Sequence, residues 1–290
     1  MKALRADIVF VQREAMLIGP PAIEAFISKI MRKPIVLDLD DAVFTPYVSP
    51  TYGKWLSKLK WFSKTDYILK NSTHVIAGSE YLQSYALRFN KNVSLIPSAV
   101  DTYRMRPNSA KRNSPVPVIG WIGSHSSTQY FKMLLPVLEV LAEKHEFKLK
   151  VVGASENFHF SGIDIANLEW SLEREIEDFQ SLDIGVYPIV EDEWSVGKCG
   201  LKAIQYMAVG VPAVCSPIGV VKQIIQDGVN GYLARTPDEW IEKLCILLDN
   251  PSLREKIGNA GRETVERHYS LEKWAPQLLE VIHKCINSKR

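Results

Sequence analysis

Residues 197–219, GKCGLKAIQYMAVGVPAVCSPIG, decide the fold that we expect for this chain. The stretch predicts a glycine-containing loop, a short helix, a Gly-Val-Pro turn at 210–212, a buried strand over 213–215 and a second loop. Lys198 and Lys202 stand where the helix begins, and there the free backbone N–H groups and the helix dipole favour an anion. Lysine adds a point charge suited to a diphosphate, so the stretch suggests a nucleotide or nucleotide-sugar site.

The chain on both sides of this stretch alternates β-branched runs with helical patterns. The polar segment 106–117 has no apolar period and predicts a linker. Strands separated by helices pair in parallel and bind ligands at their carboxyl ends, so we expect an α/β fold of two Rossmann-like parallel-sheet units, the first incomplete. The strands are expected at 7–12, 35–39, 74–77, 93–97, 118–122, 148–152, 168–170, 183–188, 213–215 and 231–234.

Two helical patterns carry more specific expectations. Leucines at helical spacing predict one long helix over 128–145. From residue 237 onward the chain is expected to be mostly helical, with breaks near 250–251, 258–261 and 269–270 where Pro, Gly or Ser interrupt the pattern.

Composition indicates an ordinary globular protein. The 290 residues carry a net charge of +2 and four cysteines without a CxxC pair, which suggests buried free thiols in a reducing, cytoplasmic setting. We expect no signal peptide and no membrane span, because no uncharged apolar run approaches ~18 residues. No cysteine–histidine cluster predicts a metal site. Basic residues prevail before residue 107 and acidic ones after it, either by chance or because the two parts meet different partners.

Two loops offer candidate ligand contacts. After the strand 118–122, Gly123 lets the backbone approach a ligand and Ser124 donates to phosphate, or the pair forms a plain turn with a serine cap. In the acidic loop before Lys198, Asp192 accepts hydrogen bonds from sugar hydroxyls and Trp194 stacks on a sugar, or the loop is merely solvated and the tryptophan packs.

The run 183–231 resembles the C-terminal signature of glycosyltransferase family 4 enzymes of GT-B fold. The hinge strand 93–101 and the loop 120–124 resemble the same family. The signature residues are Tyr206, Met207, Ala208, Gly210, Pro212, Val214, Ser216, Pro217, Gly219, Asp227, Gly228, Asn230 and Gly231.

The resemblance implies a GT-B-like fold whose two units face a cleft. Residues 1–105 would form a partial acceptor-side domain, 106–117 the linker, 118–270 the nucleotide-sugar domain and 271–290 a helix crossing back toward the first domain. It further implies retaining transfer of a hexose from a UDP- or GDP-sugar to a glycan or lipid-linked acceptor, without a metal or other cofactor and without nucleic acid as a partner.

The resemblance also assigns roles to residues of the nucleotide-sugar domain. Gly123 and Ser124 would face the diphosphate, Lys198 and Lys202 would neutralise the leaving group, Trp170 and Ser171 would hold the base, and Gln205 would bind the ribose.

The chain departs from the family at the two glutamates of the E-x7-E motif. Gly197 and Gln205 stand in their places, and we expect a carboxylate from 191–193, such as Asp192, to substitute for the first. The Arg and Lys expected after the first strand of the domain are missing, and Lys198 is the expected replacement.

On the acceptor side, Asp40 and Asp41 stand where many relatives carry a catalytic His-Asp pair, and a carboxylate there orients or deprotonates an acceptor hydroxyl. The alternative is a pair of helix-capping acids. Arg13 and Glu14 follow the first strand and would face the same crevice.

The short first domain and the segment 53–64 leave alternatives open. A truncated chain, a misassigned start or a completing partner would account for the length, and a non-catalytic or partner-completed nucleotide-sugar-binding subunit is the second hypothesis, with a sugar-nucleotide epimerase as the third. The helix 53–64 carries tryptophans among lysines and either docks on an anionic membrane, at its inner face, or packs in the core.

Overall fold

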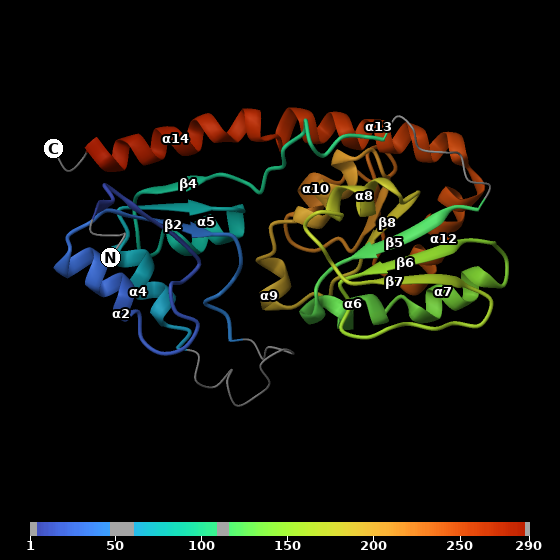
Figure 1. The fold of residues 1–290 in the computed structure, drawn as a ribbon, viewed down its shortest axis with the longest axis horizontal. Coiled ribbons are helices and arrows are strands. Elements are labelled where there is room, and N and C mark those ends of the chain that lie inside the picture. The colour runs from blue at the N-terminus through green and yellow to red at the C-terminus, as the bar shows by residue number, and fades with distance from the viewer. Residues whose placement is uncertain (1–4, 47–60, 109–115, 288–290) are drawn as a thin grey trace. The chain divides into compact units, whose positions relative to one another are not determined.

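The structure is a computed structural model that describes residues 5–46, 61–108 and 116–287 (Figure 1). The chain forms two compact units. Unit 1 comprises residues 1–98, 191–199 and 272–290, and unit 2 comprises residues 99–190 and 200–271. In the described part of the chain, no helix is long and apolar enough to cross a membrane.

Unit 1 is built on a parallel four-stranded sheet of order β1-β2-β3-β4. The strands are β1 (Val9–Gln12), β2 (Ile35–Leu39), β3 (His74–Ala77) and β4 (Val93–Leu95). The helices are α2 (Ala22–Ala25), the π-helix η1 (Phe26–Ile30) that continues it, α4 (Lys64–Asn71), α5 (Glu80–Ala86), α9 (Glu193–Val196) and, from residue 272 on, α14 (Leu271–Asn287).

The β-branched and leucine side chains of β2 explain why this strand lies at the centre of unit 1. Leu37 and Leu39 pack into the core with helices α4 and α5. Val36 points to the other face, where it packs with Val281 and Cys285 of α14. A parallel strand that is covered on both faces has a continuous apolar sequence. The sequence of β2 is apolar from residue 35 to residue 37 and is interrupted by Asp38.

Unit 2 is built on a parallel six-stranded sheet of order β10-β9-β8-β5-β6-β7. The strands are β5 (Val118–Ile122), β6 (Lys148–Val152), β7 (Asp164–Leu168), β8 (Ile184–Tyr187), β9 (Ala213–Cys215) and β10 (Tyr232–Leu233). The helices are η2 (His125–Ser127), α6 (Thr128–Lys132), α7 (Leu135–Ala142), α8 (Glu175–Gln180), α10 (Leu201–Ala208), α11 (Val221–Ile224), α12 (Pro237–Asp249) and α13 (Pro251–His268).

The expected α/β fold with two parallel-sheet units is confirmed, whereas two predicted elements and one predicted helix break are corrected. The helix expected over 128–145 is divided, because Pro136 begins a new helix, α7, after a turn at 133–134. The strand expected at 168–170 lies at 164–168. Only residues 61–64 of the segment 53–64 belong to the described residues, so its membrane hypothesis cannot be placed on the fold.

The break expected near 258–261 is absent, since α13 runs through both glycines. A Cβ on Gly258 would lie 2.1 Å from the backbone oxygen of Gly210, and one on Gly261 would lie 3.1 Å from the backbone oxygen of Asn230. These glycines therefore allow α13 to pack closely on α10 and its following turn, at the cost of about 1 kcal/mol each in helix propensity.

Candidate functional site

The first candidate site lies at the carboxyl ends of the strands in unit 2, where Tyr206 fixes two elements. Tyr206 in α10 is fully buried, and its hydroxyl accepts a hydrogen bond from the backbone N–H of Ile122 at 3.0 Å. Ile122 is the last residue of β5, so this bond ties the loop after β5 to the helix that carries Lys202 and Gln205.

The loop after β5 has the close-packed geometry expected of a ligand-approach loop. A Cβ on Gly123 would lie 2.1 Å from the ring of Trp121, so only glycine fits there. Ser124 is exposed and begins η2, where its side chain and that of Ser127 form a capping box. The capping alternative for Ser124 is thus borne out, while its predicted contact with phosphate stays a prediction.

Glu175 gathers three of the residues predicted for donor binding. Its Oε1 accepts hydrogen bonds from Trp170 Nε1 at 3.4 Å and from Gln205 Nε2 at 3.3 Å, and it lies 3.9 Å from Lys202 Nζ. These three side chains come from the end of β7 and from α10, and Glu175 is the first residue of α8. We call Trp170, Glu175, Lys202 and Gln205 the Glu175 cluster.

Two residues of the Glu175 cluster have buried polar groups whose burial costs free energy. Burial lowers the pKa of Lys202, and the neighbouring Glu175 carboxylate partly opposes this shift. Gln205 is only 6% exposed, and its Oε1 is buried without a hydrogen-bond partner. A buried acceptor without a partner costs about 1–3 kcal/mol, which a ligand that donates a hydrogen bond would recover.

Ser171 lies beside the cluster without joining it. Its hydroxyl donates to Glu173 Oε2 at 2.5 Å, on the exposed turn that leads into α8. The predicted base contact of Trp170 and Ser171 has no test in the structure, but Trp170 is 47% exposed and so presents part of its ring to solvent.

The segment 191–199 belongs to unit 1. Two of its side chains that were predicted to bind the donor, those of Asp192 and Trp194, contact other residues of unit 1. Asp192 caps α9, with its Oδ1 accepting from Ser195 N–H at 2.6 Å. Trp194 is partly buried against the core of unit 1. The alternative in which Trp194 packs against the protein therefore holds for the buried part of its ring.

Gly197 explains one departure from the E-x7-E pattern. A Cβ at this position would lie 2.4 Å from Cβ of Ala42 and 3.0 Å from its backbone nitrogen. A glutamate therefore cannot occupy position 197 without displacing the turn that follows β2.

The second candidate site is a group of three carboxylates at the end of β2 in unit 1. Arg13 holds Asp40 in a bidentate ion pair, with Nε–Oδ1 at 2.5 Å and Nη2–Oδ2 at 3.0 Å. Arg13 adopts φ +60°, a left-handed conformation that costs a non-glycine residue on the order of 1 kcal/mol or more. The backbone is thus bent to aim the guanidinium at Asp40.

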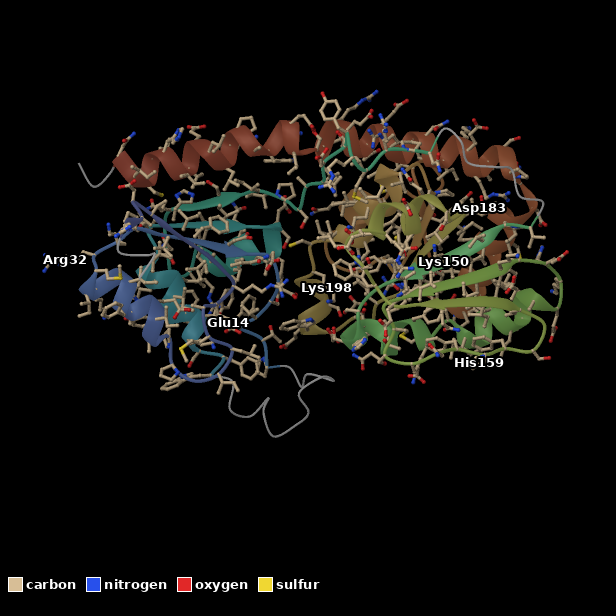
Figure 2. All side chains as sticks on the ribbon, viewed as in Figure 1. Glu14, Arg32, Lys150, His159, Asp183 and Lys198 are labelled. Carbon is tan, nitrogen blue, oxygen red and sulfur yellow. The ribbon has the colours of Figure 1, made fainter. Side chains whose placement is uncertain are left out.

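Asp38 and Asp41 are the less neutralised members of this group. Burial and the nearby Asp40 raise the pKa of Asp38 to about 6, although Arg13 opposes the shift. Burial also raises the pKa of Asp41, while Lys198 and Arg13 oppose this. Asp41 Oδ2 lies 3.8 Å from Arg13 Nη2. The charge of Lys198 (Figure 2) therefore acts on Asp41 within unit 1.

Cys199 supports the turn that carries Asp40. Its thiol donates to the backbone oxygen of Asp40 at 3.1 Å, and burial raises its pKa to about 12. The thiol stays protonated at neutral pH, so it supports the turn at Asp40 and is no nucleophile.

Glu14 has a different environment from the one predicted for it. Its Oε2 lies 2.9 Å from Lys64 Nζ, and both side chains are buried. Arg13 thus joins the carboxylates as expected, whereas Glu14 is engaged in a buried ion pair with α4.

Sequence analysis missed Glu175 and Asp38. Both follow from contacts between distant segments, and the only local signal for Asp38 was the acidic turn in which it stands. Among the described residues, no group of three or more His, Cys, Asp or Glu is arranged to hold a metal ion.

Comparison with known proteins gives matches over parts of the chain. Residues 116–250 match the family model described as "Glycosyl transferases group 1". A trehalose synthase of Pyrococcus horikoshii is 29% identical over 84 residues, which cover 29% of this chain and 20% of that protein. A phosphatidyl-myo-inositol mannosyltransferase of Mycobacterium leprae is 32% identical over 91 residues, which cover 31% and 24%. The matched stretches are thus about a fifth to a quarter of these relatives' own length.

Solved structures match over nearly the whole chain. Sucrose-phosphate synthase from Thermosynechococcus elongatus superposes with a TM-score of 0.72 at 16% identity, covering 98% of this chain and 75% of that one. Anabaena Alr3699/HepE in complex with UDP-glucose superposes with a TM-score of 0.75 at 14% identity, covering 98% and 80%. The chain therefore has the GT-B fold of solved glycosyltransferases, and its residues 116–250 match the group 1 glycosyl transferases.

Proposed function

We propose that the protein is a retaining glycosyltransferase that moves a hexose from a UDP- or GDP-sugar to a glycan or a lipid-linked acceptor, without a metal. The observation that carries this proposal is the Glu175 cluster at the carboxyl ends of the strands of unit 2. Open parallel sheets bind their ligands at this edge. The HepE structure with UDP-glucose supports a nucleotide sugar as the donor.

In this proposal, the cluster binds the donor through complementary groups. The carboxylate of Glu175 accepts hydrogen bonds from ribose hydroxyls, while Gln205, whose Oε1 is buried, donates to that carboxylate and holds it in place. The ammonium group of Lys202, whose charge is costly where it is buried, stabilises the negative charge of the diphosphate. Trp170 stacks on the base, and the exposed Ser124 hydroxyl donates to a phosphate oxygen.

Asp41 is the carboxylate of unit 1 best suited to act on the acceptor. Asp40 is neutralised by two hydrogen bonds from Arg13, while Asp41 has a 3.8 Å contact with Arg13, the charge of Lys198 and one hydrogen bond at 3.2 Å from the backbone N–H of Ala42 to its Oδ1. We propose that Asp41 takes the proton of the acceptor hydroxyl as the hydroxyl oxygen bonds to the anomeric carbon on the face from which the diphosphate leaves, which retains the anomeric configuration. The bond from that carbon to the diphosphate breaks, and the nucleotide diphosphate leaves with the electron pair.

The test combines donor binding with turnover. The purified chain is incubated with UDP-glucose, UDP-N-acetylglucosamine, GDP-mannose and GDP-glucose, and both thermal protection and donor hydrolysis are measured. We expect protection and slow hydrolysis with one of them. Asp41→Asn should keep the protection and lower hydrolysis at least about 100-fold, the lower end of the range for a lost general base. No protection by any donor would refute the proposal.

A second candidate is a nucleotide-sugar-binding subunit that needs a partner for catalysis. It is favoured by the loss of both motif glutamates at Gly197 and Gln205. Thermal protection without hydrolysis by the wild-type chain, and hydrolysis only after a second chain is added, would decide for this candidate.

A further inference from the structure

We propose that the loop 15–19 and the helix α2–η1 of unit 1 form a docking surface for an anionic lipid bilayer. The surface carries an unusual number of exposed apolar side chains. Six of them are between 38% and 71% exposed: Met16, Leu17, Ile18, Ile23, Phe26 and Ile30. Exposed apolar side chains that gather in this way mark interaction sites.

The exposure of the loop is enforced from inside the unit. Lys64 Nζ, which is buried, donates to the backbone oxygens of Met16 and Leu17, the latter at 3.0 Å, and pairs with Glu14. Glu24 accepts from the backbone N–H of Ala15 at 2.8 Å. With the backbone held inward by charged groups, the side chains of Met16, Leu17 and Ile18 are left to face solvent.

The helix adds a second row of apolar side chains next to this loop. Ile23, Phe26 and Ile30 follow a spacing of three and four residues and are exposed, whereas Glu24 and Ile27 of the same helix are buried. The bond from Glu24 to Ala15 joins the helix to the start of the loop.

The charges of this region identify an anionic partner. Residues 15–33 contain one acid, Glu24, which is 2% exposed and bonded to the loop. The basic residues of the same stretch are Lys29 and Arg32, which are exposed, and Lys33, which is half-buried. The neighbouring helix α4, which packs beside α2 (Figure 1), ends in the exposed Lys70, while its Asp66 accepts a hydrogen bond from Tyr85.

Apolar side chains flanked by cations, with no accessible acid in the stretch, fit the interface of an anionic bilayer. A protein partner or a second copy of this chain could dock on the apolar side chains alone and would not require the cations beside them.

Co-sedimentation of the full chain with vesicles tests the proposal, and it does so independently of the transferase reaction. Vesicles of phosphatidylcholine alone are compared with vesicles that contain 30–40% phosphatidylglycerol. We expect binding to the anionic vesicles, and at most weak binding to the neutral ones. Lys29→Gln/Lys33→Gln should weaken binding roughly 25-fold, because each cation near the surface contributes about fivefold.

Apolar variants and controls complete the test. Leu17→Ser/Phe26→Ser/Ile30→Ser should weaken binding by about tenfold or more, since each exposed side chain loses its burial in the interface. Met133→Ser and Lys256→Glu, at exposed positions of unit 2, should bind as the wild type does. Thermal melting confirms that each variant is folded.

Three results would overturn the proposal. They are no vesicle binding at low salt, equal binding to neutral and anionic vesicles, and an equal loss with the unit 2 controls. Self-association without vesicles that the apolar variant abolishes, measured by sedimentation velocity, would instead assign this surface to a second copy of the chain.

Discussion

Replacing Glu175 with glutamine should weaken nucleotide binding more than any other single change in unit 2. All three contacts of Glu175 are made through Oε1, with Trp170, Gln205 and Lys202. Within the described residues, Oε2 is thus left for a ligand. A hydrogen bond to a charged group contributes about 1.5–3 kcal/mol, so its loss predicts nucleotide binding that is about 10- to 150-fold weaker.

The same change affects the partners of Glu175. The carboxylate fixes the amide of Gln205 with Nε2 toward it, and this leaves Oε1 pointing away as an acceptor. A glutamine at position 175 presents either an oxygen or an NH2 group, so it no longer fixes that orientation. Lys202 also loses its counter-charge in a buried setting, which should lower its pKa further.

A reciprocal exchange separates a role in the cluster from a general loss of stability. Gln205→Glu alone would bring a second carboxylate to the position of a group now 3.3 Å from Glu175, so we expect it to lower both stability and affinity. The double variant Glu175→Gln/Gln205→Glu restores one carboxylate and one amide. We expect it to recover most of the affinity lost by Glu175→Gln, because two residues in contact are coupled.

Isothermal titration calorimetry with UDP and with GDP measures these affinities, and thermal melting measures stability. Glu177→Gln is the matched control, because Glu177 lies on the same helix, is exposed and is not in contact with the cluster. The reasoning is refuted if Glu175→Gln binds within about twofold of the wild type, or if the double variant binds no better than Glu175→Gln.

Two further predictions concern stability. The folded-state pKa of Asp38, about 6, exceeds its ordinary value of 3.8, so the native state binds more protons between these values; the free energy of unfolding should fall as pH rises from about 4 to about 6, and Asp38→Asn should remove this part of the pH dependence in urea titrations. Gly258→Ala should lower the free energy of unfolding by roughly 1–3 kcal/mol or more, because its Cβ would meet the oxygen of Gly210 at 2.1 Å, whereas Ala260→Gly on the same helix should cost only about 1 kcal/mol.

The sequence predicted strands better than it predicted helix ends. Val118–Ile122 lies where its apolar run indicated, because a central parallel strand that is covered on both faces is apolar throughout. Lys148–Val152 also lies where it was expected, although it carries two lysines beside its buried residues. The glycines of α13 misled the prediction, since their helix cost is repaid by close packing on α10 that no local pattern reveals. The packing of α13 thus outweighs the helix-breaking tendency of Gly258 and Gly261.

The candidate site was predicted in part for a similar reason. Lys202 was predicted from its place at the start of the helix, which is α10, and Gln205 from its position in the E-x7-E motif of the family that the chain resembles. Glu175 lies in the charge-rich stretch 169–178 and reads there as one solvated acid among several. Only the packing of α8 beside α10 singles it out, through its contacts with Gln205 and Lys202.

The two departures from the glutamate motif have different physical causes, and they should be judged separately. At position 197 a side chain is excluded by Ala42, so no carboxylate can be restored there without moving the turn after β2. At position 205 the neutral amide lies 3.3 Å from a carboxylate of another helix. A carboxylate is therefore present beside position 205, but it belongs to Glu175. A motif compared position by position counts this as a loss, whereas the structure places the carboxylate of Glu175 beside Gln205 and Lys202 at the strand ends of unit 2.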